Sequence, residues 1–226
     1  MIDDSDRGTR GSSRPLALGV TIVLGVLYCA LPASAVSCSA SPLILDLAGD
    51  GVQTTDLFSA VKFDIHGEGR LVTMAWTADW SEDAFLWNDL NRDGLVDGGG
   101  ELFGDSTLLP DGTPAANGFE ALKVYDDSTY GGNADGKISD RDLGWTDLRL
   151  WIDRNHDGVS QVDEIATLGD LGISEILLTY REDRDVDGNG NWHFLKASFL
   201  REIEAPWGKA LARRPIEDVY FRYENP

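Results

Sequence analysis

The chain has 226 residues, and Asp and Glu outnumber Lys and Arg by 39 to 19, which gives a formal net charge of −20. Nucleic acid and anionic lipid both need a basic surface to neutralise their phosphates, so we expect neither as a partner. The acidic residues gather in clusters of Asp, Asn and Gly and form no continuous tail, a pattern that favours cations as partners.

The first 35 residues have the parts of a secretory signal peptide. Three arginines precede an apolar run over residues 15–31, and a small-residue triplet, Ala-Ser-Ala, ends at Ala35. We expect cleavage after Ala35 and a mature protein that is periplasmic, attached to the cell surface or extracellular. The alternative is an uncleaved membrane anchor, because the apolar run is close to the roughly 17 residues that can just span a bilayer.

A short linker over residues 36–41 follows the signal. Of the two cysteines only Cys38 remains in the mature chain, so no internal disulfide can form. Residues 34–38 loosely fit a lipoprotein processing site, and lipidation of Cys38 would be a second route to a membrane. The sequence therefore links this protein to a membrane only through Cys38 or through an uncleaved signal.

The mature chain alternates apolar stretches with acidic, glycine-rich loops. Short strands are expected at 42–47, 61–65, 71–76 and 84–87. Apolar residues at helical spacing after Asn117 predict a helix over 117–126. We expect another short helix after Ser139, an apolar segment over 148–152 and a helix over 164–171.

The last quarter of the chain changes character. Residues 173–180, 192–200 and 219–223 are rich in β-branched and aromatic residues, which predicts strands. The fold class is therefore predicted to be α+β, with short strands and helices around EF-hand-like calcium loops. A calcium-binding domain is expected over 42–172, with a strand-rich extension over 173–226 packed on the same domain.

Two acidic loops match the ligand pattern of an EF-hand. Calcium takes six to eight oxygens, which a twelve-residue loop supplies from positions 1, 3 and 5, a backbone carbonyl at position 7, and a carboxylate at position 12, with Gly at position 6. The 153–164 loop fits this pattern fully, whereas the 89–101 loop has its carboxylate at position 13 and needs one bulged residue among its three glycines. The expected ligands are Asp153, Asn155, Asp157, Val159 and Glu164 in the first loop, and Asp89, Asn91, Asp93, Leu95, Asp97 and Glu101 in the second.

A third loop, 133–142, offers Asn133, Asp135, Lys137 through its carbonyl, and Asp142. Its position 1 is a glycine. Asp126 or Asp127 could serve there only if residues 128–132 loop out. The alternative is a structural turn that caps the following helix.

Other loops and motifs point to structure more than to chemistry. The stretches 46–51 and 64–69 resemble worn copies of the calcium loop and are expected to be strand-ending turns, and 185–190 is expected to be a hairpin turn. The mature chain has no Cys-x-x-Cys, Gly-x-Ser-x-Gly or His-Glu-x-x-His motif. We therefore expect no catalytic residues.

From Ser41 to about Ile173 the order of motifs resembles the calcium-dependent self-processing module of iron-regulated RTX proteins. The resemblance rests on Pro42 to Gly51, Phe63-Asp64, Trp76, Asp89 to Asp105, Asp111 to Thr113, Asn117 to Phe119, Leu148 to Trp151 and Asp153 to Glu164. It implies a bacterial, calcium-binding fold. In that module an Asp-Pro bond is cut when calcium folds the domain, and the aspartate attacks its own carbonyl.

The matching bond in this chain is Ser41-Pro42, and a serine hydroxyl cannot form the five-membered anhydride that this chemistry needs. We therefore expect an exported calcium-binding protein, ordered by calcium outside the cytoplasm, that is not an enzyme. The alternatives are a calcium-dependent self-processing or hydrolytic enzyme, and an adhesion module whose tail (173–223) offers an edge strand to a partner. The sequence names no protein partner.

Overall fold

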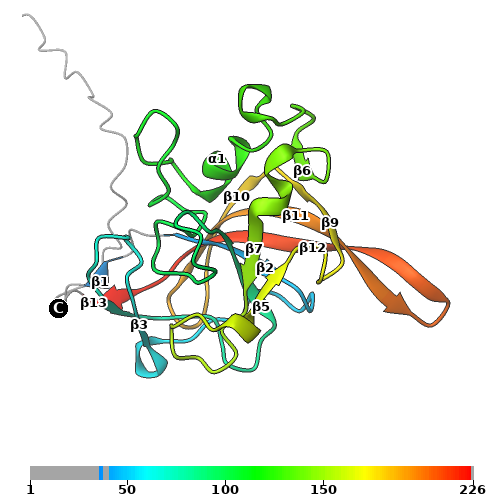
Figure 1. Cartoon of the computed structure of the whole chain (residues 1–226). Coiled ribbons are helices and arrows are strands. Elements are labelled where there is room, and N and C mark those ends of the chain that lie inside the picture. The colour runs from blue at the N-terminus through cyan, green and yellow to red at the C-terminus, as the bar shows by residue number, and fades with distance from the viewer. Residues whose placement is uncertain (1–35, 38–40, 225–226) are drawn as a thin grey trace, which may run out of the picture.

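A computed structural model describes residues 36–37 and 41–224 of the chain (Figure 1). The predicted signal peptide and Cys38 lie outside the described residues. Within the described part, no helix is long and apolar enough to cross a membrane.

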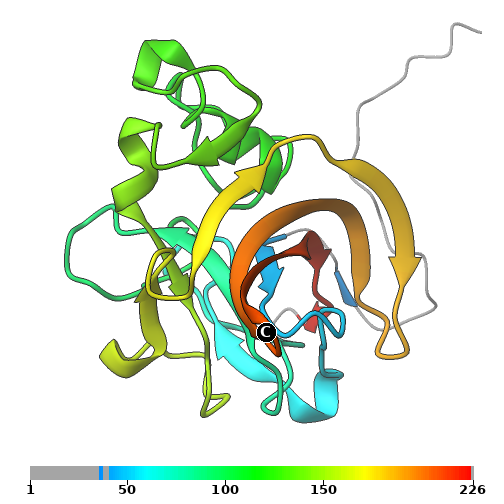
Figure 2. The same cartoon turned by 90° about the vertical axis from the view of Figure 1, so that its right-hand side faces the viewer.

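Two antiparallel sheets make up the fold. The smaller has the strand order β1-β13-β4-β3, and the larger has the order β6-β9-β11-β12-β2-β5-β7-β8, with β10 also paired to β11. Figure 2 shows the long strands β10 to β12 curling into an arc. The strands are β1 (Val36–Ser37), β2 (Leu43–Asp46), β3 (Val61–Phe63), β4 (Val72–Met74), β5 (Asp83–Asn88), β6 (Lys137–Ser139), β7 (Leu148–Trp151), β8 (Ile165–Thr167), β9 (Ile173–Leu177), β10 (Arg181–Val186), β11 (Trp192–Ala205), β12 (Gly208–Tyr220) and β13 (Tyr223–Glu224).

Helical structure is sparse. The one α-helix of the described residues is α1 (Gly118–Lys123), which Asn117 caps by accepting a hydrogen bond from the backbone N–H of Glu120. The 3₁₀ turns are η1 (Leu57–Ser59), η2 (Ser128–Tyr130), η3 (Leu143–Asp147) and η4 (Val162–Glu164). The predicted α+β fold class is therefore wrong, because the chain is mostly β.

The predicted helix over 164–171 shows why the sequence overestimates the helical content. Residues 165–167 instead form β8 and pair with β7, so that Trp151 lies opposite Ile165. The acidic loop reverses the chain directly onto the strand that leads into it, and strand pairing overrides local helix propensity. Ser139 likewise ends β6, and only the 3₁₀ turn η3 follows. The three calcium-like loops therefore lack the pair of flanking helices that defines an EF-hand.

The strands β2 and β5 lie at the centre of the larger sheet and are buried on both faces. Leu43 and Leu45 of β2 and Leu86 of β5 pack into one core cluster with Phe119 and Phe199. The alternating residues point the other way, into a mainly aromatic cluster with Trp76 and Trp151. Burial on both faces explains why these two segments are continuously apolar and why the sequence predicts them as strands.

A buried charged network ties the C-terminal strands to the first half of the chain. His193 on β11 contacts Glu217 of β12 through Nδ1 at 2.6 Å and Asp187 through Nε2 at 3.4 Å. Asp187 also accepts a hydrogen bond from Thr54, and Asn191 donates to the carbonyl oxygen of Thr55 at 2.9 Å. Burial opposes a charge on His193, but the hydrogen bonds to Asp187 and Glu217 outweigh it and raise its pKa to about 9.

We expect His193→Gln to lower the free energy of unfolding by about 3 kcal/mol at pH 6, because it removes the positive charge that pairs with the buried Glu217 and the partly buried Asp187. The folded-state pKa lies above the ordinary 6.5, so the stabilisation is complete below pH 6.5 and is lost as pH rises through about 9. Urea unfolding at pH 6 and pH 9.5 measures both effects. His66→Gln, outside this network, is the control. An equal loss at both pH values would show that the imidazolium charge contributes nothing.

Candidate functional site

The three calcium-like loops share one backbone geometry. In each, the residue at position 4 and the glycine at position 6 have positive φ: Arg92 (65°) and Gly94 (81°), Ala134 (57°) and Gly136 (85°), His156 (57°) and Gly158 (70°). The carboxylate at position 1 accepts hydrogen bonds from the backbone N–H groups of positions 5 and 6. Asp89 accepts from Asp93 and Gly94, and Asp153 accepts from Asp157 and Gly158. The spacing in the sequence thus corresponds to a real, repeated turn.

Asp126 takes position 1 of the third loop. Its two carboxylate oxygens accept from the N–H groups of Asp135 at 3.0 Å and Gly136 at 2.9 Å. Residues 127–132 form a local excursion that contains η2, and the N–H of Ala134 donates to the carbonyl oxygen of Asp126 at 2.8 Å. The sequence leaves Asp126 and Asp127 open for this role, and the geometry selects Asp126.

The last carboxylate of each loop folds back over its start. Glu164 accepts from the N–H of Arg154 at 2.8 Å, and Glu101 accepts from the N–H groups of Leu90 at 3.1 Å and Asp97 at 3.0 Å. Asp142 accepts from Asn133 at 3.0 Å and Ser139 at 2.8 Å. Each loop therefore brings its first and last carboxylates toward the same turn.

The extra residue of the 89–101 loop is accommodated by close packing. The N–H of Gly99 donates to the carbonyl oxygen of Asp64 at 2.7 Å. A Cβ atom at Gly99 would lie 1.7 Å from the carbonyl oxygen of Ile65, so only glycine fits there. The bulge is thus seated on the neighbouring 64–69 turn.

Between these carboxylates lie amide groups. Asn91 Nδ2 donates to Asp97 Oδ2 at 2.6 Å and to Asp93 Oδ2 at 3.2 Å, and Asn155 Nδ2 donates to Asp157 Oδ2 at 3.0 Å. The described residues contain no group of three or more His, Cys, Asp and Glu side chains that could hold a metal. The loops instead combine carboxylate oxygens with the amide oxygens of Asn91 and Asn155, and oxygen ligands are the kind that hard cations prefer.

The remaining predicted ligands have other surroundings. Leu95 and Val159, which were predicted to offer backbone carbonyls, donate their N–H groups to Asp93 and Asp157 of the same loops. Lys137 lies in β6, and its ammonium group pairs with Glu175 of β9 at 2.5 Å.

Two fully buried tryptophans hold carboxylates of the 153–164 loop. Trp76 Nε1 donates to Asp153 Oδ2 at 2.8 Å, and Trp151 Nε1 donates to Glu164 Oε2 at 3.1 Å. Burial raises the pKa of Asp153 and of Glu101 above the ordinary values. A bound cation would favour the ionised forms of both groups and offset that cost.

The other acidic stretches are structural turns, as predicted. Asp46 and Asp64 each accept from two backbone N–H groups of the glycine-containing turns that follow them. The 185–190 stretch joins β10 to β11 as a hairpin, in which the N–H of Asp187 donates to the carbonyl oxygen of Asn191 at 3.0 Å.

Two carboxyl groups, the buried Asp218 and the partly buried Asp105, lie beside Ser41, a cluster that the sequence alone does not reveal. The backbone N–H of Ser41 donates to Asp105 Oδ1 at 3.1 Å, and the N–H of Gly118 donates to Asp218 Oδ2 at 2.8 Å. Ser41 Oγ and Asp218 Oδ1 are buried without a well-aligned hydrogen bond. Burial raises the pKa of Asp218 to about 7 and that of Asp105 to about 6.

The peptide between Ser41 and Pro42 is held tightly. Pro42 pairs with Gly104, and a Cβ atom at Gly104 would lie 1.8 Å from the carbonyl oxygen of Ser41. The N–H of Val219 donates to the carbonyl oxygen of Pro42 at 3.2 Å. The bridge to Gly104 and strand β12 therefore hold this bond beside the buried Asp218 and the partly buried Asp105.

Comparison with known proteins identifies the family. The chain matches the SPM domain over residues 43–205, a span that runs from β2 to the end of β11. It belongs to the SPM-domain family. Over 162 residues it is 40% identical to Iron-regulated protein FrpA of Neisseria meningitidis serogroup C. The aligned segment is 71% of this chain and 14% of that relative, so the two share one region of a much longer protein. The match agrees with the resemblance to iron-regulated proteins, and neither comparison shows an EF-hand.

We expect Asp218→Asn to flatten the pH dependence of stability. The folded state keeps a proton on Asp218 up to about pH 7, whereas the unfolded state releases it near 3.8, so the free energy of unfolding falls as pH rises through this window. The amide stays neutral, and the variant should gain stability over the wild type between pH 4 and pH 8. Urea unfolding across this range measures the gain. The exposed change Asp111→Asn is the control, and parallel pH profiles of wild type and Asp218→Asn would disprove the expectation.

Proposed function

We propose that this SPM-domain protein binds calcium through three loops, 89–101, 126–142 and 153–164, and that the ions order the domain. The observation that carries the proposal is the shared geometry of the three loops, in which the first and last carboxylates converge on one turn although the third loop contains an insertion. The mixed oxygen donors and the net charge of −20 support a hard cation over a transition metal.

Calcium would act on stability by relieving repulsion. Each loop holds several carboxylates whose backbone hydrogen bonds do not cancel their mutual repulsion, and a divalent ion does. Affinity in the extracellular range, about 10⁻⁴ to 10⁻³ M, would keep the sites empty in the cytoplasm and filled outside. At about a hundred times the dissociation constant, each ion adds roughly 2.7 kcal/mol to the stability of the fold.

Export completes this proposal. The predicted signal peptide would deliver the chain to a compartment where calcium is abundant, and the fold would then tighten after translocation. Whether the protein stays in the periplasm, on the surface or outside the cell does not change the argument, because calcium is available in all three places.

Calorimetric titration of the chain from residue 36, freed of calcium with a chelator, tests the proposal. We expect two or three ions to bind, with magnesium binding much more weakly. Glu164→Gln, Glu101→Gln and Asp126→Asn should each weaken one site at least tenfold, because each removes a charged ligand.

The neighbouring variants Asp163→Asn and Asp127→Asn make the same charge change outside the proposed ligand set, and they should leave binding unchanged. Equal losses in Asp126→Asn and Asp127→Asn would remove the third site from the proposal. A folded protein that takes up no calcium would refute the proposal as a whole.

We further propose that the chain does not cut itself, because Ser41 stands where the resembling modules have the attacking aspartate. The tight seat of the peptide between Ser41 and Pro42 is consistent with a retained scaffold whose nucleophile is missing. In calcium the wild type should keep its full mass.

Intact mass spectrometry of a Ser41→Asp variant tests this reading of the scaffold. The substitution restores an Asp-Pro bond, and we expect calcium-dependent cleavage after position 41. Ser41→Asn, which has nearly the same shape but a far weaker nucleophile, is the control. Loss of the residues before Pro42 from the wild type would favour the self-processing alternative instead.

A further inference from the structure

One oxygen of Asp218 is buried beside Ser41 without a hydrogen-bond partner. Asp218 Oδ2 accepts from the N–H of Gly118 at 2.8 Å, whereas Asp218 Oδ1 and Ser41 Oγ are both buried and unpaired. Asp218 lies opposite Leu43 in the pairing of β12 with β2, and Ser41 precedes Leu43 by two residues, so both side chains point to the same face. An unpaired buried carboxyl oxygen costs free energy, and a chemical role is one explanation for such a cost.

Asp218 is a proton donor at neutral pH. The titratable groups that face it are Asp105 and Tyr220. Burial raises the pKa of Asp218 to about 7, and the charge of Asp105 contributes to the increase. Burial and the two carboxyl groups also raise the pKa of Tyr220 above the ordinary value, so its phenol stays neutral. Asp218 therefore presents a carboxylic acid to the side chain of residue 41.

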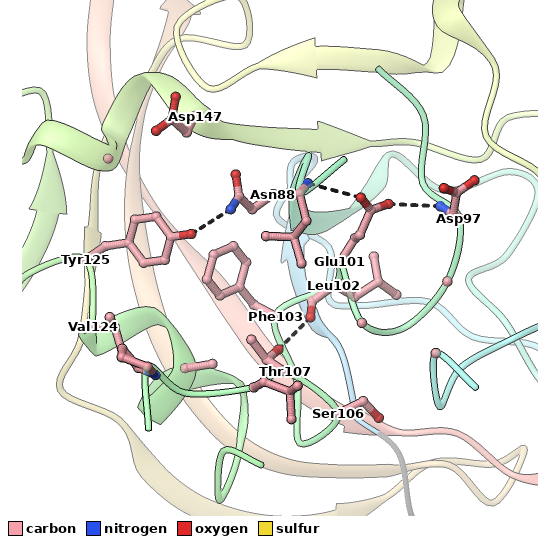
Figure 3. A pocket seen from close by; sticks show the side chains of 18 of the residues that line it. Asn88, Asp97, Glu101, Leu102, Phe103, Ser106, Thr107, Val124, Tyr125 and Asp147 are labelled. Carbon is pink, nitrogen blue, oxygen red and sulfur yellow. Dashed lines mark hydrogen bonds between the residues drawn. The ribbon is translucent and has the colours of Figure 1, made fainter. Parts of the chain in front are cut away.

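Asp105 contacts the backbone of the same residue. Its Oδ1 accepts from the N–H of Ser41 at 3.1 Å. The turn that carries Asp105 is itself fixed, because the Thr107 hydroxyl accepts from the N–H of Gly104 at 2.9 Å and donates to the carbonyl oxygen of Leu102 at 2.7 Å (Figure 3). Gly104 packs on the carbonyl oxygen of Ser41 with no room for a Cβ atom. The turn therefore holds the Ser41 peptide in place.

We propose that Asp218 is the proton donor, and Asp105 a positioning residue, of a self-cutting site that this chain retains without its nucleophile. The inference rests on the proposed function, in which Ser41 occupies the place of the attacking aspartate. Asp218 is catalytically silent in the wild type, because a serine at position 41 gives it no reaction to assist.

The proton of Asp218 has a definite destination once position 41 carries an aspartate. A carboxylate oxygen of that aspartate bonds to the carbonyl carbon of its own residue, and the bond from this carbon to the nitrogen of Pro42 breaks. The proton of Asp218 passes to the nitrogen, because an amine leaves far more easily when it is protonated. Water then opens the five-membered anhydride to two carboxyl groups, and one of the protons released returns to Asp218.

The turn of Asp105 also connects this site to a proposed calcium ligand. Glu101 directly precedes the turn. The N–H of Leu43, the residue after Pro42, donates to the carbonyl oxygen of Phe103 at 2.7 Å. An ion held by Glu101 would steady the turn and with it the peptide, which explains why the restored reaction should require calcium.

The pH dependence of cleavage in the Ser41→Asp variant tests the role of Asp218. Intact mass spectrometry of the full-length chain in calcium gives the rate at each pH. We expect a bell-shaped profile, because the introduced carboxyl group and Asp218 react only while they share one proton. The falling limb should lie above pH 7, since the introduced carboxylate opposes ionisation of Asp218.

Second changes in the Ser41→Asp variant separate the two roles. Asp218→Asn should slow cleavage at least tenfold and remove the falling limb. Unfolding cannot cause this loss, because Asp218→Asn is expected to gain stability. Asp105→Asn keeps an acceptor for the backbone N–H of residue 41 and should cut nearly as fast as the parent, whereas Asp105→Ala should be at least tenfold slower. The exposed change Asp111→Asn is the control.

The outcomes distinguish this inference from the proposal on which it rests. Equal rates and equal pH profiles with and without Asp218→Asn would overturn the role of Asp218 and leave the scaffold reading intact. Equal losses in Asp105→Asn and Asp105→Ala would overturn the positioning role of Asp105. A Ser41→Asp chain that keeps its full mass in calcium, folded or not, would overturn the scaffold reading and this inference together.

Discussion

The structure depends on one repeated interaction, a carboxylate that accepts hydrogen bonds from neighbouring backbone N–H groups of a glycine turn. Asp46, Asp64, Asp89, Asp126 and Asp153 all do this at the points where the chain changes direction. Without these carboxylates, the backbone N–H groups of the turns would have no hydrogen-bond acceptor. The short strands can therefore be connected without flanking helices.

This dependence gives the acidity of the chain a structural role. The same carboxylates that shape the turns are those that a cation would bind, so folding and ion binding draw on one set of groups. At the Asp46 turn a second carboxylate comes from Asp83 on the paired strand β5, which accepts a hydrogen bond from the N–H of Gln53 at 2.7 Å.

Much of this could be predicted from the sequence because it is local. Loop positions follow from fixed spacing, and the central strands follow from continuous apolar runs. The helix expected after Glu164 failed because pairing with β7 is a non-local contact that no short window contains. Strand β12 was missed over 208–218, where Lys, Arg and Pro obscure the β pattern and only its partner β11 defines it.

The site residues also divide into those that local sequence identifies and those that only non-local contacts bring together. The sequence motifs identify Asp89 and Asp153 directly. Asp126 is separated from the rest of its loop by an insertion, and only the fold brings the two parts together. Asp105 and Asp218 meet around Ser41 from positions more than a hundred residues apart, and nothing in either local sequence predicts this contact. Membership of the SPM-domain family accounts for the order of the motifs but not for these contacts.

One feature of the aromatic core has a practical consequence. Because the indole N–H groups of Trp76 and Trp151 donate to the first and last carboxylates of the 153–164 loop, a change of charge there acts directly on two chromophores. Both rings are buried and pack at a tilt against Phe63 and Phe85, so their emission senses little of the solvent. These two indoles therefore form an intrinsic optical reporter that is hydrogen-bonded directly to the carboxylates of this loop.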